Sequence, residues 1–247
     1  MNAPDAEALL QTWDANQGAH LICRALALLD AAWPEVGVEA WSRASIGERD
    51  ACLLELRETL FGVQLETVAD CPGCGERLES SFTTLGIRVQ PAVVPPRQAS
   101  FHLSEQGCDI EYRLPSSGDL LAAVESTSDI AGASEELLRR CVIDARLDGA
   151  SLDLAKLPST VMTRLADDMR QRDPGAEVRM ALSCPICGHA WSATFDIVSY
   201  LWSEIEDWAQ RLLADVCVLA TACGWSERDI LGLSPTRRQI YLDMVQA

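Results

Sequence analysis

Apolar residues recur at helical spacing through roughly the first 60 positions of the chain. Leu9, Leu10 and Trp13 form one short stripe, and the segment 21–29 carries a second. Spacing of this kind is typical of helices with one buried face. The second stripe stops just before Pro34, because proline disfavours helical backbone in the residue that precedes it. We therefore expect two short helices at the N-terminal end.

A third helix is predicted by signals at both of its ends. Ser45 and Glu48 have the spacing of a capping box, in which each side chain satisfies a backbone N–H of the other residue. Gly62 supplies a C-terminal stop, since glycine adopts the left-handed backbone that ends many helices. Between these signals, apolar residues lie near one face, and they are expected to pack into a core.

The middle of the chain changes pattern several times. Residues 77–89 favour a strand, and a proline-rich linker follows. Residues 100–114 alternate enough to predict a hairpin, with Gln106 and Gly107 near its turn. From 119 to about 172 we expect mainly short helices.

The C-terminal third predicts a short strand and then the longest helix of the chain. The strand is expected at 190–195 and the helix at 198–223, with Gly224 as its stop. A last helix is predicted to begin at Ser234 and Pro235, which suit the N-cap and the first helical position.

One internal repeat stands out in this pattern. The segment CPGCGERLESSFTTL, beginning at Cys71, aligns with CPICGHAWSATFDIV, beginning at Cys184. Cysteine, proline, cysteine, glycine and phenylalanine coincide at identical offsets. Two copies of a knuckle followed by a strand are what a zinc ribbon is built from, here with about a hundred residues between them.

The four repeated cysteines are the candidate metal ligands. They are Cys71, Cys74, Cys184 and Cys187. Structural zinc sites close all four tetrahedral positions with protein ligands, and a Cys-x-x-Cys turn brings two sulfurs close enough for one ion. Proline after the first cysteine stiffens the turn, and glycine after the second tolerates positive φ. The sequence therefore predicts one shared structural zinc ion.

Two alternatives to a shared zinc site remain open at this level. The long gap between the knuckles leaves room for separate or incomplete metal sites, and Cys-Pro-x-Cys also occurs in disulfide oxidoreductases. Redox sites of that kind need a strand before the motif and a helix that starts at it. Here a helix precedes the first motif and strand-like sequence follows each, which favours metal. His189 is expected to be a loop residue. The cysteines outside the knuckles that lie in helical patterns are expected to be small core residues: Cys23, Cys52, Cys141, Cys217 and Cys223.

Charge and composition disfavour several classes of partner and of activity. The chain has 20 Lys and Arg against 37 Asp and Glu, a net charge of -17, which disfavours nucleic acid and anionic membranes as partners. No apolar run approaches the ~20 residues of a membrane-spanning helix, and the N-terminal residues lack the positive region of a secretory signal. A cytoplasmic protein is therefore expected. Only 3 histidines and no nucleotide, hydrolase or metalloprotease motif are present, so we expect no enzymatic activity.

Two regions of the sequence carry a family resemblance. They are IGERDACLLELRETLFG, from Ile46, which runs into CPGCGERLE, and GWSERDILGLSPTRRQIYLDMV, from Gly224. The combination resembles the baseplate hub assembly chaperones of contractile phage tails of the T-even type. It is closer to zinc-knuckle relatives in phage-like contractile injection systems. The resemblance implies a factor that helps a baseplate hub or spike protein assemble, without chemistry.

The C-terminal segment that carries the resemblance also contains candidate partner-binding residues. Short capped helices there carry apolar and basic side chains that could form a docking surface: Trp225, Ile230, Leu231, Arg237, Arg238 and Tyr241. The alternative is that the apolar members belong to the core and the arginines to a solvated face. A permanent baseplate subunit and a zinc-ribbon adapter or regulator of another complex are the alternative functions.

The expected fold class is α+β, mostly helical, with a zinc ribbon assembled from two distant halves. We expect an N-terminal helical segment at 1–70, the two ribbon halves at 71–90 and 184–197, an α/β subdomain inserted at 91–183, and C-terminal helices at 198–247. The inserted subdomain should contain the hairpin and the short helices.

Overall fold

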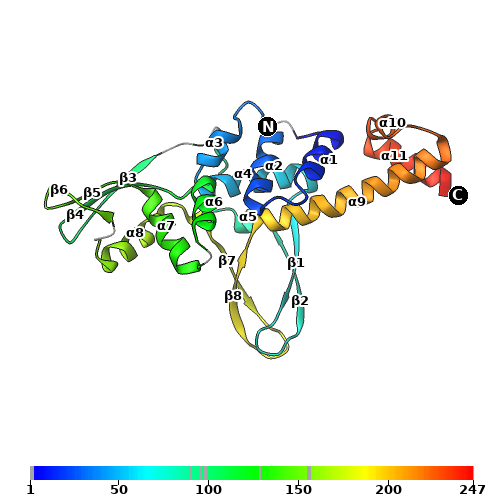
Figure 1. Cartoon of the computed structure of the whole chain (residues 1–247). Coiled ribbons are helices and arrows are strands. Elements are labelled where there is room, and N and C mark those ends of the chain that lie inside the picture. Colours follow the sequence, from blue (N-terminus) through cyan, green and yellow to red (C-terminus); the bar gives the residue numbers. More distant parts are fainter. Residues whose placement is uncertain are drawn as a thin grey trace. The chain divides into compact units, whose positions relative to one another are not determined.

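A computed structural model describes residues 3–89, 91–94, 96, 99–127, 129–154 and 157–246 (Figure 1). Helices make up 56% of the chain and strands 20%, so the α+β class, mostly helical, is confirmed. The chain divides into two compact units. One joins the segment ending at Pro34 to the segment beginning at Val198, and the other runs from Glu35 to Ile197. Of the five segments expected from the sequence, both ribbon halves and the insertion lie in the second unit.

The first unit is helical and joins the two ends of the chain. It contains α1 (Ala6–Ala15), α2 (Leu21–Ala32), α9 (Ile197–Cys223), α10 (Glu227–Leu231) and α11 (Pro235–Gln246). Leu10 of α1 packs in one buried cluster with Ala209 and Leu212 of α9. The Arg24 guanidinium lies 4.6 Å from the centre of the Trp202 ring, a cation–π contact between α2 and α9. The N-terminal helices therefore use the long helix as their packing surface.

The end of the first unit is a small helical cluster with well-formed caps. Gly224 has φ +70 and ends α9, as predicted. Ser234 caps α11, where its side chain accepts a hydrogen bond of 3.3 Å from the Arg237 N–H. A capping box of Ser226 with Asp229 starts α10. Each change of chain direction here is thus fixed by local hydrogen bonds.

The helical part of the second unit is built around α4 (Ile46–Phe61). The predicted capping box is present: the Ser45 side chain accepts from the Glu48 N–H, and the Glu48 carboxylate accepts from the Ser45 N–H at 3.1 Å. Gly62 has φ +87 and ends the helix, as predicted. The helices α3 (Val38–Arg43) and α6 (Ser117–Ser126) contact each other beside it. The segment Pro174–Ala176, a single 3-10 turn, also packs on α4.

A small sheet subdomain follows in the chain. Its strand order is β3 (Ser100–Glu105), β4 (Cys108–Arg113), β5 (Val142–Leu147) and β6 (Ala150–Ser151), all antiparallel. The predicted hairpin turn is confirmed, since Gln106 and Gly107 both have positive φ, as tight hairpins require. The expectation of mainly short helices after residue 119 is wrong in part, because β5 and β6 interrupt the helices α7 (Ile130–Cys141) and α8 (Ser159–Arg172).

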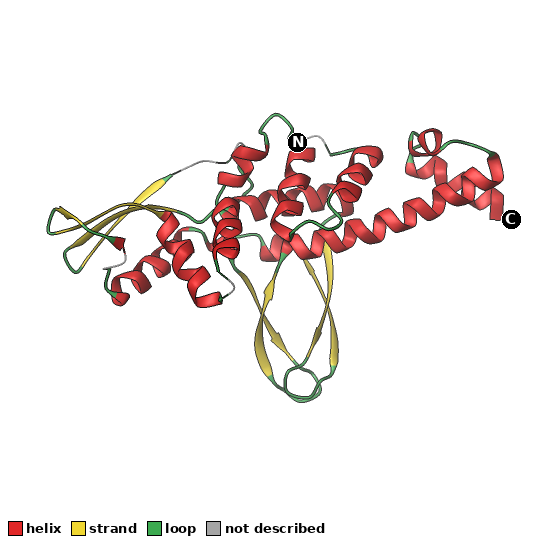
Figure 2. Ribbon diagram, viewed as in Figure 1, coloured by secondary structure: helices red, strands yellow, loops and turns green. Residues whose placement is uncertain are grey.

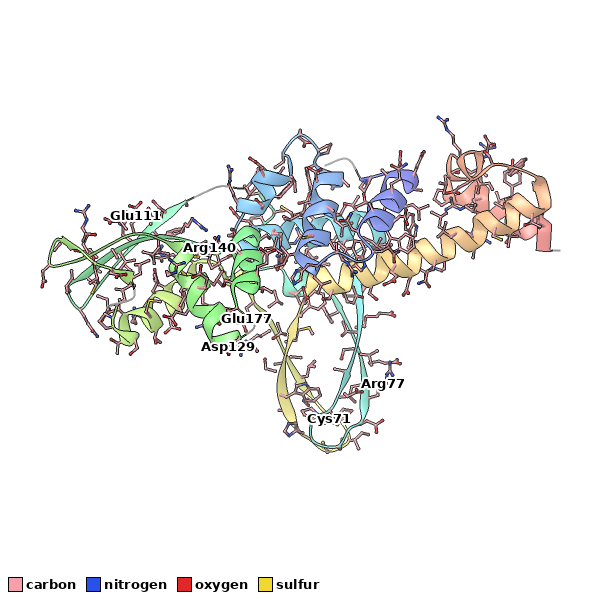
Figure 3. The ribbon with its side chains drawn as sticks, in the orientation of Figure 1. Cys71, Arg77, Glu111, Asp129, Arg140 and Glu177 are labelled. Carbon is pink, nitrogen blue, oxygen red and sulfur yellow. The ribbon has the colours of Figure 1, made fainter. Side chains whose placement is uncertain are left out.

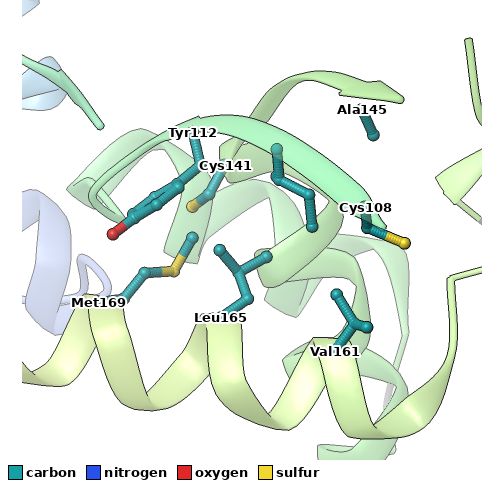
Figure 4. Packing of buried hydrophobic residues seen from close by; sticks show 8 residues of the cluster. Cys108, Tyr112, Cys141, Ala145, Val161, Leu165 and Met169 are labelled. Carbon is teal, nitrogen blue, oxygen red and sulfur yellow. The ribbon is translucent and has the colours of Figure 1, made fainter. Parts of the chain in front are cut away.

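This subdomain has a core of its own (Figure 4). Side chains from β4, β5, α7 and α8 meet in one buried cluster: Cys108, Ile110, Tyr112, Cys141, Ala145, Val161, Leu165 and Met169. Burial raises the pKa of the Tyr112 hydroxyl to about 12, and a hydrogen bond to Asp168 acts in the same direction. The insertion between the knuckles therefore has a core that contains none of the four knuckle cysteines.

Two hairpins complete the second unit (Figure 2). One is β1 (Gln64–Asp70) with β2 (Arg77–Thr83), and the other is β7 (Val178–Ser183) with β8 (Ala190–Phe195). The strands after each knuckle were predicted, and β8 has the predicted bounds. The strands before each knuckle were not, and the short helix α5 (Thr84–Ile87) replaces the end of the predicted strand 77–89. No helix among the described residues is both long enough and apolar enough to cross a bilayer.

The independence of the insertion core can be tested with Leu165→Ala. Leu165 is fully buried in the cluster of Figure 4, so its truncation should lower the free energy of unfolding by about 2–5 kcal/mol. Denaturant unfolding measures this change, and elemental analysis should find the metal content unaltered. A loss below about 1 kcal/mol would contradict the assignment of this core.

Candidate metal centre

The two knuckles have the same backbone structure. In the first, the Cys71 N–H donates to the Glu76 carbonyl and the Gly75 N–H to the Cys71 carbonyl, both at 2.8 Å. In the second, the Cys184 N–H donates to the His189 carbonyl at 2.8 Å and the Gly188 N–H to the Cys184 carbonyl at 2.9 Å. The repeat seen in the sequence is therefore a structural repeat.

Glycine is required after the second cysteine of each knuckle. Gly75 has φ +76 and Gly188 has φ +73, a backbone region that other residues rarely adopt. This turn also lets backbone N–H groups approach sulfur, and the Gly73 N–H donates to the Cys71 sulfur at 3.4 Å. The shared Cys-Pro-x-Cys-Gly pattern thus has a direct conformational cause.

The four cysteine sulfurs converge at the ends of the two hairpins, where Figure 3 labels Cys71. All four lie within 4.8 Å of one another. Two distances between the knuckles, Cys71 to Cys187 and Cys74 to Cys184, are 3.7 Å. A tetrahedral site with metal–sulfur bonds of about 2.3 Å has sulfur–sulfur edges of about 3.8 Å. The four sulfurs can therefore hold a single metal ion.

Electrostatics of the cluster also favour a bound cation. Hydrogen bonds from the Cys187 and Ile186 backbone lower the pKa of the Cys184 thiol to about 7, despite burial. A hydrogen bond from the Glu76 backbone lowers the pKa of Cys74, but its neighbouring sulfurs and burial outweigh this and raise it to about 12. Four thiolates cannot coexist at this distance without a cation, because each negative charge opposes the next.

The first knuckle is packed closely by a residue of the second. A Cβ atom added to Gly73 would lie 3.0 Å from the Cβ and Cγ atoms of His189, so even a methyl group here would require His189 to shift by a few tenths of an ångström. His189 in turn stacks on Trp191, with ring centres 6.2 Å apart. His189 is therefore a packing residue of the loop, as expected, and the group of possible metal ligands found in the described residues contains the four cysteines alone.

The bases of the hairpins are also joined. Phe82 of β2 and Phe195 of β8, the repeated phenylalanines, meet edge to face with ring centres 5.8 Å apart. The hairpins thus touch through equivalent residues at both ends. A closed four-sulfur site of this kind leaves no coordination position for a catalytic water, so it can stabilise structure and cannot activate a substrate.

The redox alternative has less support than the metal alternative. A strand does precede each knuckle, which the sequence did not predict, but no helix begins at either motif. β2 and β8 follow instead, so the helix N-terminus that activates the thiol of a disulfide oxidoreductase is missing from both knuckles. The two knuckles also share one cluster, which argues against separate metal sites.

The other cysteines divide between core and surface. Cys52 and Cys141 are buried, and burial raises the pKa of each thiol to about 12. The expectation that all helical cysteines are core residues is wrong for Cys217 and Cys223, which are exposed on α9. Their helical spacing was correct, but the sequence did not indicate which face of α9 packs.

The predicted partner-binding residues lie in the first unit, and the structure corrects two of them. Ile230 is fully buried in a cluster with Val216, Leu219 and Leu242, and Arg238 is 7% exposed beside Asp215. These two side chains are internal, so the prediction that they form a docking surface is wrong. Trp225, Leu231 and Tyr241 are half-buried and pack against the same cluster, and Arg237 is exposed.

Metal binding by the cluster can be tested with Cys184→Ser. The change removes one of four ligands, so bound metal should fall from about one ion per chain toward zero, with a lower unfolding temperature. Elemental analysis and thermal unfolding measure both effects. Cys217→Ser makes the same substitution at an exposed thiol outside the cluster and should retain the metal. Equal metal content in the two variants would rule out the site.

The close packing of the knuckles can be tested with Gly73→Ala. Because the new methyl group meets His189, the variant should lose metal to a chromogenic chelator faster than the wild type. In a His189→Gly background, which removes both the Cβ and the Cγ atom that the methyl group meets, the same change should have little effect, which gives a coupling energy of about 1 kcal/mol. Additive effects of the two substitutions would contradict this contact.

Comparison with protein-family models, curated proteins and solved structures finds no match to this chain. The functional argument therefore depends on the residues themselves. The chain could hold one metal ion on four cysteines drawn from two segments more than a hundred residues apart. This four-cysteine cluster, joining two equivalent hairpins, is the candidate functional site.

Proposed function

We propose that the protein is a non-enzymatic assembly factor that acts by binding another protein, with one zinc ion as a structural support. The observation that carries this proposal is the closed cluster of four cysteines, with two sulfur–sulfur distances of 3.7 Å between the knuckles. A site without an open ligand position contributes folding free energy and no chemistry. Its role is then to hold a surface that another protein recognises.

Zinc is the metal that suits this cluster best. Four thiolates with tetrahedral spacing are a donor set for zinc or iron, and zinc has no redox chemistry that the protein would have to control. We assign the protein to the cytoplasm, because a reducing compartment keeps thiols available for metal. The net charge of -17 favours a protein client with basic surface over a nucleic acid or an anionic membrane.

The client that we propose is a hub or spike protein of the baseplate of a contractile phage tail or phage-like injection system. This part of the proposal depends on the resemblance of residues 46–79 and 184–245 to baseplate hub assembly chaperones. The helices α4, α9, α10 and α11 carry most of those residues. Of the six residues first considered for client binding, Arg237 has an exposed side chain, and it is the best candidate for a direct contact.

Two other functions fit the same cluster. A permanent baseplate subunit would remain in purified particles, whereas an assembly factor would be absent from them. An adapter or regulator of another complex would bind none of the sheath, tube, hub or spike proteins. Mass spectrometry of purified particles from a complete gene cluster therefore separates the first alternative from the assembly factor.

The proposal predicts that the affinity-tagged chain captures a hub or spike protein when it is expressed with its neighbouring genes. Arg237→Glu should reduce that capture at least several-fold, since it reverses an exposed charge at the proposed contact. The matched control is Arg211→Glu, which reverses the charge of another exposed arginine, on α9. This variant should capture the hub or spike protein as well as the wild type does. Recovery of no baseplate protein from a cluster whose products are all expressed would contradict the function.

A further inference from the structure

The first hairpin has a free edge along β1. Its sheet has two strands, and β2 is the neighbour of β1 within the part of the chain that the structure describes. The pairing is regular over seven residue pairs, from Gln64 with Thr83 to Asp70 with Arg77, without a bulge. Strand edges in proteins are commonly protected by proline, lysine or a bulge, and β1 has none of these. It is therefore an open template for another strand.

The hydrogen bonds at the two ends of the hairpin show which groups of β1 face this edge. The Thr84 N–H donates to the Val63 carbonyl at 3.0 Å, and the Cys71 N–H donates to the Glu76 carbonyl at 2.8 Å. Antiparallel strands alternate between bonded and non-bonded pairs, so the odd-numbered residues from 63 to 71 bond to β2. The N–H and C=O groups of Val68 and Asp70 consequently point away from β2.

The side chains of these same residues are exposed. Val68 is 50% exposed, and Asp70 is exposed two positions further along, whereas Leu65 on the opposite face is fully buried. If a strand were added at this edge, one of its side chains would lie beside Val68. The side chains two positions before and after that one would each lie beside an acidic group of β1. Because side chains of one face recur at every second residue, these contacts fall at alternate residues of the added strand, and they are charged, apolar and charged in turn.

Charge distinguishes β1 from the three other hairpin strands. Its outward residues include Glu66 and Asp70 and no basic residue. The outward residues of β2 include both Arg77 and Glu79, which offset each other, and those of β7 include only one charge, Arg179. β8 has no charged outward residue. Among the four hairpin strands, β1 is therefore the one whose outward side chains carry a net negative charge.

The metal site adds negative charge next to this edge. Asp70 directly precedes Cys71, and four thiolates around a divalent ion leave about two negative charges in excess. This contribution rests on the metal site proposed above. Together with Asp70 it disfavours pairing of β1 with β1 of a second copy, because like charges would face each other across the new strand pair.

We propose that the free edge of β1 binds an extended basic segment of another protein by strand addition. The segment would alternate lysine or arginine with apolar residues, so that all its cations lie on the outward face, opposite Glu66, Val68 and Asp70, while its backbone bonds to Val68 and Asp70. Backbone hydrogen bonds supply affinity in this mode, and alternate side chains supply specificity.

A labelled peptide tests the proposal directly. A fluorescein-labelled, end-capped peptide of about four Lys-Val repeats should bind the full-length, metal-loaded chain in fluorescence anisotropy. Binding should weaken as salt is raised, and a Glu-Val peptide of equal length should not bind. In hydrogen exchange, the peptide should slow the amides of Val68 and Asp70, while those of the odd-numbered residues are protected already.

Val68→Pro is the decisive variant, because it removes an outward N–H and no bond to β2. It should weaken peptide binding about ten-fold or more. Ala181→Pro makes the same change at the equivalent position of β7 and should leave binding unaltered. If a low metal content shows that the Val68→Pro variant does not fold, Asp70→Asn is used in its place. Glu79→Gln on β2 removes the same charge and is the matched control.

Peptide binding that survives both Val68→Pro and Asp70→Asn, or that the control variants weaken equally, would overturn the proposal. Absence of Lys-Val binding to the loaded chain would also overturn it. These results do not depend on a baseplate client, so they can be separated from the pull-down outcome. Loss of baseplate capture with intact peptide binding would contradict the proposed function and leave the strand edge supported.

Discussion

Mutual repulsion between four closely spaced cysteine thiolates is the constraint on which the two hairpins of the second unit depend. The sulfurs of Cys71 and Cys187, and those of Cys74 and Cys184, lie 3.7 Å apart across the two knuckles. Thiols at this spacing resist joint ionisation, and the pKa of Cys74 is raised to about 12 in their company. A divalent ion would remove this penalty, and its binding free energy would then contribute to folding because both hairpins must be in place.

The position of the insertion explains why a metal is effective here. The two knuckles are separated by more than a hundred residues, and closing a long loop costs conformational entropy that grows slowly with its length. The insertion reduces this cost because it folds on its own core, with Leu165 and Val161 fully buried. The equivalent phenylalanines, Phe82 and Phe195, join the hairpin bases in addition. Local folding thus brings the cysteines near each other, and a metal ion bound to all four would fix the final contact.

Local chemistry made much of this structure predictable. The capping box at Ser45, the stop at Gly224 and the turn at Gly107 depend on residues near in sequence, and each is confirmed. The strand β1 was missed, because its outward residues other than Val68 are polar and no continuous apolar run marks it. The burial of Ile230 and Arg238 was missed for another reason: it depends on α9, which supplies Val216 and Asp215 from a different part of the chain.

The two hairpins share a backbone and differ in their surfaces, and this difference separates structure from recognition. The repeated cysteines, glycines and phenylalanines all serve the metal cluster or the contact at the hairpin bases. Outside this set the repeats diverge: Val68 and Asp70 on β1 correspond to Ala181 and Ser183 on β7. Since the four-cysteine cluster requires nothing of these positions, their chemistry is available for the strand addition proposed above, and of the two hairpins the first has the acidic edge.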